Sequence, residues 1–95
     1  MNNQIKTIMC CCGQGLGSSM LVRLNTEKVL KNLGITGVQV EHSTIADAVE
    51  GAANLFIFGS DLKQFIPNLK SPVILLDNIV DIKELEGKIK TVFNI

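Results

Sequence analysis

Cys12 opens a glycine-rich segment whose residue types suit phosphate chemistry. Glycine occupies every second position from Gly13 to Gly17, and two serines follow. Without Cβ atoms in the way, such a backbone can turn successive N–H groups inward and form a concave anion site. A helix that starts at Ser18 would add its unpaired N–H groups and its partial positive charge. The two serine hydroxyls would either bind phosphate or cap the helix. The predicted phosphate-binding residues are therefore Gly13, Gln14, Gly15, Leu16, Gly17, Ser18 and Ser19.

The sulfur of Cys12 would lie in the same electrostatic field. Positive potential favours a thiolate, so we expect the pKa of this thiol to fall below its ordinary value of about 8.5. A thiolate that faces a bound phosphoryl group is placed for in-line attack on phosphorus. The sequence thus predicts phosphoryl transfer through a phosphocysteine. Cys12 is the nucleophile and carrier, and no metal or organic cofactor is indicated.

Other phosphate sites with similar spacing compete with this interpretation. The interval from Cys12 to Ser18 is that of the cysteine phosphatases, C-x5-R, with serine in place of arginine. Serine cannot replace the bidentate guanidinium that stabilises the equatorial oxygens during hydrolysis, which favours relay of the phosphoryl group. The dinucleotide fingerprint G-x-G-x-x-G fails at Ser18, although Glu41 stands where a ribose-binding acid would. A small cysteine phosphatase and a nucleotide-binding module remain the alternatives.

The other reactive side chains have structural interpretations. Cys10 and Cys11 are expected to be buried and to behave as small hydrophobic residues. The rival is a redox-sensing module, in which one of them resolves oxidised Cys12. His42, the only histidine, is expected at the surface, one strand away from Cys12. Asp61 is expected to cap a helical turn over residues 61–65, because a carboxylate beside a phosphate would repel it.

The elements that would position Cys12 alternate between strand and helix. Strands are predicted at residues 5–11, 38–42, 55–58 and 72–76, longer helices at 18–33 and 81–93, and short helical segments at 44–49 and 61–65. Thr44 with Asp47, and Asp81 with Glu84, have the spacing of capping boxes. This alternation predicts a single α/β domain, Rossmann-like, with right-handed crossovers and helices on both faces of a parallel sheet. The predicted order of its four strands is 2-1-3-4, which brings the cysteine loop to the topological switch point where ligands bind.

The first predicted helix carries apolar residues on two sides. One stripe, expected to face the core, consists of Val22, Thr26, Val29, Leu30 and Leu33. Met20, Leu21 and Leu24 lie on the other side, near the end closest to Cys12. Together with Leu16 they would form an exposed apolar collar around the phosphate site, and such patches often mark docking surfaces. Packing of the same residues under a neighbouring loop is the alternative.

Composition narrows the possible functions. The chain of 95 residues, 46% hydrophobic and 19% charged, is long enough for one globular domain. Nine basic and nine acidic residues cancel, and tryptophan and tyrosine are absent, which argues against nucleic acid and anionic membranes as partners. No apolar stretch approaches the roughly 18 residues of a membrane span, and the polar residues 1–4 do not begin a signal peptide. We therefore expect a cytoplasmic protein that does not insert into the membrane.

The segment from Cys12 to Met20, with its glycines and paired serines after a first strand, resembles the enzyme IIB components of the phosphoenolpyruvate-dependent sugar phosphotransferase system. It is most similar to the ascorbate/galactitol type, and residues 17–20 favour ascorbate. The resemblance extends over residues 1–95, taken as one phosphocysteine domain. It implies that Cys12 accepts a phosphoryl group from a phosphohistidine of a IIA protein. Cys12 then passes it to a sugar bound by the IIC membrane permease, L-ascorbate or else galactitol or another pentitol or hexitol.

Overall fold

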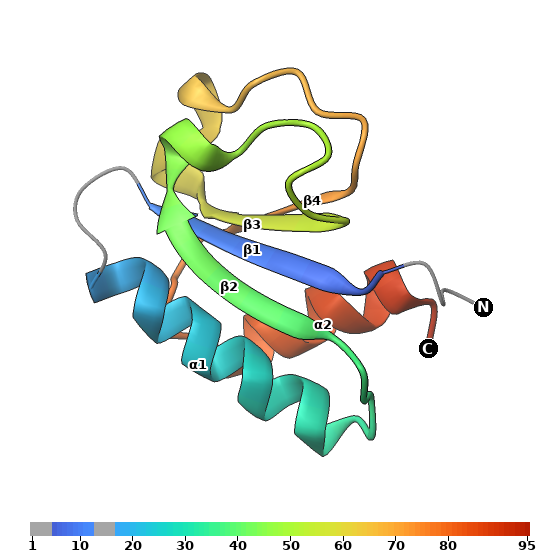
Figure 1. The fold of residues 1–95 in the computed structure, drawn as a ribbon. Coiled ribbons are helices and arrows are strands. Elements are labelled where there is room, and N and C mark those ends of the chain that lie inside the picture. The colour runs from blue at the N-terminus through green and yellow to red at the C-terminus, as the bar shows by residue number, and fades with distance from the viewer. Residues whose placement is uncertain (1–4, 13–16) are drawn as a thin grey trace.

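A computed structural model describes residues 5–12 and 17–95, with Cys12 described for its backbone alone. In chain order the described elements are β1 (Thr7–Cys12), α1 (Gly17–Asn32), β2 (Gln39–Thr44), the 3-10 helix η1 (Ile45–Asp47), β3 (Leu55–Gly59), the 3-10 helix η2 (Ser60–Phe65), β4 (Val73–Leu76) and α2 (Ile82–Phe93) (Figure 1). All eight correspond to segments that the sequence predicts, with shifts of one or two residues at most ends.

The four strands form one parallel sheet in the order β2-β1-β3-β4, which confirms the predicted topology. β1 is therefore central, with β2 on one side and β3 on the other. Cys12 lies beside Thr44 of β2, and Cys11 lies beside Phe58 of β3. The carboxyl ends of all four strands meet at one edge of the sheet.

The two faces of the sheet are covered by different kinds of helix. Both α-helices pack on one face, where α1 lies over β1 and β2 and α2 lies against β4 (Figure 1). The two 3-10 helices and their loops cover the other face. Side chains of β3 alternate between these layers, so Leu55 and Ile57 join the core under the α-helices, while Phe56 and Phe58 join the core under the 3-10 helices. Because β3 is buried on both faces, it is a continuous apolar run, as expected for a central parallel strand.

Helix ends follow the predicted chemistry in α1 and α2. Gly34, two residues after the end of α1, takes a positive φ of 75°, and its N–H donates to the Lys31 carbonyl, as in a glycine C-cap. At the start of α2, the Asp81 carboxylate accepts hydrogen bonds from the N–H groups of Lys83 and Glu84. Asp81 is thus an N-cap, as predicted.

Two predicted caps are wrong. β2 continues through Thr44 because that residue still pairs with β1, so Thr44 makes no side-chain cap bond and only a short 3-10 turn follows. Asp61 does not cap the next turn either, because η2 begins at Ser60 and its N-cap residue is Gly59, without a side-chain cap bond. In both places the sheet extends further than the sequence pattern indicates and takes over the position expected to start the turn.

Side-chain hydrogen bonds also connect α2 to the end of β4 and to the loop that follows it. The Glu84 carboxylate accepts hydrogen bonds from the backbone N–H groups of Asp77 and Asn78, at 2.7 and 3.0 Å, and from the Lys88 ammonium at 2.8 Å. Lys88 also donates to the Leu75 carbonyl of β4. These bonds tie the first turns of α2 to the loop that leaves the sheet at its carboxyl edge.

Candidate functional site

The carboxyl edge of the sheet is where the fold brings together the residues predicted to act. β1 ends at Cys12, and the two strands flanking it end at Thr44 and Gly59. The chain crosses from β1 to β2 in one direction and from β2 to β3 over β1 in the other, so Cys12 lies at the topological switch point. In parallel α/β sheets, ligands bind at this point. Gly13, Gln14, Gly15 and Leu16 lie outside the described residues.

The first turn of α1 lies at the same edge. α1 begins at Gly17, one residue earlier than predicted, so Ser18 and Ser19 are helical residues of the first turn rather than N-cap residues. The N–H groups of Gly17 and Ser18 belong to the first four of the helix, which cannot bond to a carbonyl of the preceding turn. The first turn of α1 carries no acidic side chain of its own, and its N-terminus is therefore suited to an anion.

The two serines differ in accessibility. Ser18 is half-buried. Ser19 is buried, with 1% of its surface exposed, so its side chain faces the protein interior. Ser18 is thus the serine whose hydroxyl better suits contact with a bound group.

Cys10 is a core residue with an unreactive thiol. It is fully buried under α1, and its Sγ lies 3.8 Å from the Thr26 Oγ1. Burial raises the pKa of Cys10 from 9.0 to about 12, even though the bond with Thr26 acts in the opposite direction. Thr26 in turn donates to the Val22 carbonyl at 2.7 Å. Cys10 therefore behaves as the buried hydrophobic residue that the sequence predicts.

Cys11 is buried as well, on the opposite face of the sheet. It is 5% exposed and belongs to the core under the 3-10 helices, with Met9 and Phe58. Neither Cys10 nor Cys11 forms a disulfide. Of the three adjacent sulfurs, two are thus enclosed in separate cores, which makes Cys12 the candidate for chemistry.

His42 has a partner that sequence spacing did not reveal. It lies on β2 beside Cys10, half-buried, with its Nδ1 3.1 Å from the Arg23 Nη1. The guanidinium of Arg23 can only donate in this contact. Arg23 also forms an ion pair with Glu27, at 3.5 Å. Arg23 is the only arginine of the chain, and it is held at the seam between α1 and β2. For the contacts of Arg23 with His42 and Glu27, the sequence offers one signal, the i,i+4 spacing from Arg23 to Glu27.

Asp61 lies beside the end of β3, in a position made possible by glycine. A Cβ atom built on Gly59 would meet the Asp61 Oδ1 at 2.5 Å and the Ile79 Cγ2 at 3.4 Å. The carboxylate therefore occupies the space that a side chain at position 59 would fill. The sequence singled out Asp61 but placed its carboxylate at the start of a turn.

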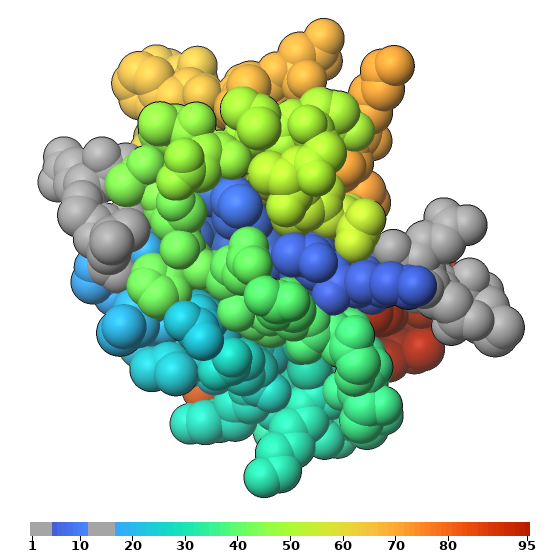
Figure 2. All heavy atoms as spheres, viewed as in Figure 1, coloured from blue at the N-terminus to red at the C-terminus, as the bar shows by residue number. Residues whose placement is uncertain are grey.

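The expected apolar collar is exposed in its described part. Met20, Leu21 and Leu24 are 48%, 36% and 54% exposed, in contrast to the buried stripe of α1. Phe65 at the end of η2 and Val80 after β4 are also exposed large hydrophobic residues, which sequence periodicity did not reveal. In the space-filling view, the first turns of α1, in light blue, reach the surface at the same end of the molecule as η1 and η2 (Figure 2).

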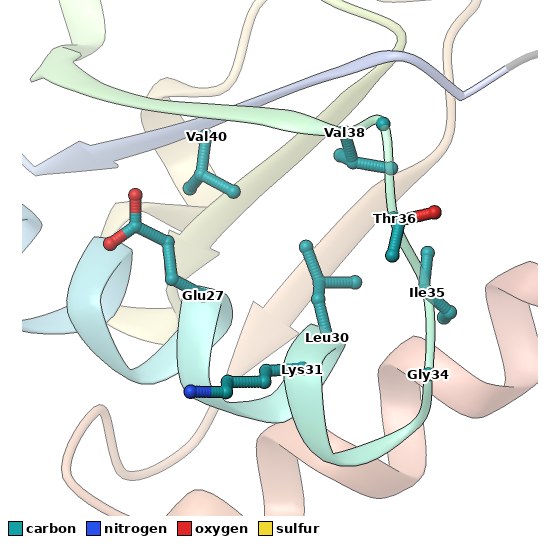
Figure 3. A pocket seen from close by; sticks show the side chains of 9 residues that line it. Glu27, Leu30, Lys31, Gly34, Ile35, Thr36, Val38 and Val40 are labelled. Atoms are coloured by element: carbon teal, nitrogen blue, oxygen red, sulfur yellow. The ribbon is translucent and has the colours of Figure 1, made fainter.

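A separate hollow lies at the other end of α1, away from Cys12. It has a volume of about 240 Å³ and is lined by Leu30, Lys31 and residues 34–38, with Val40 of β2 opposite (Figure 3). Nowhere in residues 5–12 and 17–95 do three histidine, cysteine or acidic side chains gather to hold a metal ion. Within the same ranges, no helix has the length and apolarity needed to cross a bilayer.

Two comparisons with known proteins agree with this fold. Residues 7–91 match the family described as PTS system, lactose/cellobiose specific IIB subunit. The chain is also similar to a Mycoplasma pneumoniae protein named ascorbate-specific PTS system EIIB component. The two are 32% identical over 95 residues, which cover 97% of this chain and 99% of that protein.

These matches and the four-stranded parallel sheet define a phosphotransferase that acts in sugar phosphorylation. The chain belongs to the IIB family of the sugar phosphotransferase system and is a phosphoryl carrier. Components of this kind work with IIA and IIC partners. The two matched names differ in the sugar, lactose or cellobiose in one and ascorbate in the other.

Proposed function

We propose that Cys12 is the residue that carries the phosphoryl group, with the backbone N–H groups of residues 13–19 and the Ser18 hydroxyl binding its oxygens. The observation that carries this proposal is the position of Cys12. It ends β1 at the switch point, while Cys10 and Cys11 are buried in opposite cores. The N-terminus of α1 follows within five residues and supplies backbone N–H groups and positive potential. The domain that performs this step comprises residues 1–95.

The transfer consists of two displacements at phosphorus. The Cys12 thiolate attacks the phosphorus of a phosphohistidine on the IIA partner, so an S–P bond forms as the N–P bond breaks. The electron pair of that bond returns to the histidine ring. A sugar hydroxyl then attacks the same phosphorus, loses its proton to a base, and releases the thiolate as the S–P bond breaks. The N–H groups at the start of α1 stabilise the negative charge on the phosphoryl oxygens in both steps.

Relay is favoured over hydrolysis because the chain lacks a free guanidinium for the phosphate. Ser18 stands where a cysteine phosphatase has its arginine. The one arginine of the chain, Arg23, is bound to His42 and Glu27 instead. A phosphatase would need a guanidinium to stabilise the phosphoryl oxygens during attack by water. The phosphocysteine should therefore persist until an acceptor docks.

The partners dock in turn on the apolar collar beside Cys12, formed by Leu16, Met20, Leu21 and Leu24. Its described members are exposed on one side of α1, next to the helix N-terminus that would hold the phosphate. If Leu24→Glu folds normally yet accepts phosphate from its donor at the wild-type rate, the collar is not the docking surface. Leu24→Met, which keeps the apolar contact, is the matched control.

The sugar in this proposal is L-ascorbate, with galactitol or another pentitol or hexitol as the alternative, and the reaction takes place in the cytoplasm. The similar Mycoplasma pneumoniae protein, named for ascorbate, supports the first choice. Because the IIC permease binds the sugar, uptake assays with the cognate permease and a panel of these sugars test it.

The central experiment is phosphorylation from phosphoenolpyruvate with the general phosphotransfer proteins and a cognate IIA, followed by mass mapping. The label should reach Cys12 and disappear in Cys12→Ser, while Cys11→Ser, its neighbour in β1, remains labelled. A label on another residue would refute the proposal. Turnover of an aryl phosphate by the protein alone would instead favour the phosphatase. Thermal stabilisation by a nucleotide, or an oxidisable Cys12 that takes no phosphate, would favour the nucleotide-binding or redox-sensing module.

A further inference from the structure

The carboxylate of Asp61 is close to Cys12 because of how β1 and β3 pair. Cys11 and Phe58 are the last pair of β1 and β3, so Cys12 and Gly59 are the next residues of these two strands toward the carboxyl edge. Neighbouring strands lie about 4.8 Å apart. The Asp61 Oδ1 is 2.5 Å from the position of a Cβ on Gly59, and hence within about 4 Å of the Gly59 Cα. Adding the two intervals places the carboxylate within about 9 Å of the Cys12 Cα.

The carboxylate also lies on the same face of the sheet as α1. Side chains alternate along β3, with Leu55 and Ile57 in the core under the α-helices and Phe56 and Phe58 in the other core. Position 59 therefore faces the α-helices. A Cβ built on Gly59 would also lie 3.4 Å from the Ile79 Cγ2, and Ile79 packs against the same core, which agrees with this direction. Asp61 and the N-terminus of α1 thus act on the same region, with opposite signs.

The other charged groups near this edge do not compensate for Asp61. Asp47, after β2, accepts a hydrogen bond from the Ser43 hydroxyl. Asp77 lies at the end of β4, one strand farther from Cys12 than Asp61. Lys63 is exposed on η2. Glu84 and Lys88, beside the end of β4, pair with each other. Among the side chains named here, negative charge therefore exceeds positive charge.

We infer that Asp61 sets the energy of the phosphocysteine: its carboxylate repels the phosphoryl group on Cys12 and so favours transfer to the acceptor. This inference rests on the proposed function of Cys12. The helix N-terminus makes the site bind a phosphoryl group, and Asp61 limits how tightly it is kept. The carboxylate can lie in this position because residue 59 is glycine, since any side chain there would displace it.

The test compares Asp61→Asn with Asp77→Asn, which removes the same charge one strand farther away. The first readout is the rate of Cys12 alkylation by iodoacetamide as a function of pH. Removal of a unit charge at about 9 Å should lower the pKa of Cys12 by about a third of a unit in Asp61→Asn, and by less in Asp77→Asn. The difference should shrink in 1 M salt, whereas a purely structural effect would persist.

The second readout is the equilibrium between phosphorylated IIA and this protein. A phosphoryl group carries up to two negative charges. The equilibrium constant for transfer from phosphorylated IIA to this protein should therefore be about three- to tenfold larger for Asp61→Asn than for the wild type. Gly59→Ala, whose backbone φ of −69° accepts alanine, should change both readouts in the same direction by displacing the carboxylate.

Equal behaviour of Asp61→Asn and Asp77→Asn in both readouts would overturn the inference. Failure of the proposed function is distinguishable from this result. In that case the phosphate label is absent from Cys12 in the wild type, while the alkylation profiles, which need no partner protein, still report whether Asp61 acts on the thiol.

Discussion

In the folded protein, Cys12 should be alkylated much faster than Cys10, although only Cys11 lies between them in the sequence. Burial raises the pKa of Cys10 from 9.0 to about 12. A shift of three units lowers the thiolate fraction at neutral pH about 1,000-fold. Because thiolates are the reactive form and Cys10 is fully buried, its alkylation should be at least that much slower than that of a free cysteine. The folded-state pKa lies above the ordinary value, so the thiolate forms only as the pH approaches 12.

The measurement is a time course with iodoacetamide at pH 7.5, mapped by mass spectrometry. Wild-type protein should take up one label rapidly, at Cys12, and Cys12→Ser should take up almost none. In denaturant all three thiols should react at similar rates, which controls for effects of local sequence. Reaction of Cys10 in the native protein within tenfold of its denatured rate would refute the reasoning about its burial.

Three further predictions concern the elements that surround the site. The pKa of Glu84 is lowered from 4.5 to about 2, mainly by its bond with Lys88 and then by two backbone N–H groups. Because the full shift is reduced by solvent contact, Glu84→Gln should destabilise the fold by about 1–2 kcal/mol at pH 7. In chemical denaturation that difference should vanish as pH falls from 4.5 through 2, and a constant difference would contradict it. Asp81→Ala should lower the free energy of unfolding by about 1 kcal/mol through loss of the α2 cap. Asp81→Asn, measured in the same way, should change it little. Gly59→Ala should lower the free energy of unfolding by under about 1 kcal/mol, because its φ suits alanine and only the end of Asp61 must move. A larger loss of stability in thermal melts would mean that the carboxylate cannot move away.

The strand order was predictable because it depends on local patterns. Buried apolar runs such as Leu55–Gly59 alternate with helical spacing, and right-handed crossovers leave few arrangements of four parallel strands. The burial of Cys10 and Cys11 was also predictable, because both belong to the apolar run of the first strand. These conclusions rest on neighbours in sequence.

The features that were not predictable depend on residues far apart in the chain. Thr44 continues β2 because it pairs with Cys12, and this pairing overrides a local capping pattern. The position of the Asp61 carboxylate depends on the absence of a side chain at Gly59. Likewise, the contact between Arg23 and His42 exists only because α1 lies over β2. In each case tertiary contacts decide between local options of similar energy.

The bond from Lys88 to the Leu75 carbonyl has a consequence for a protein that must leave each partner after every transfer. β4 is an outer strand, and an unpaired row of carbonyl and N–H groups along such a strand invites another chain to add to the sheet. The ammonium group occupies one acceptor of that row and places a charge beside it. Strand addition would bury this charge, so lasting association through β4 is disfavoured. A carrier protected in this way does not hold a partner by strand addition at its β4 edge.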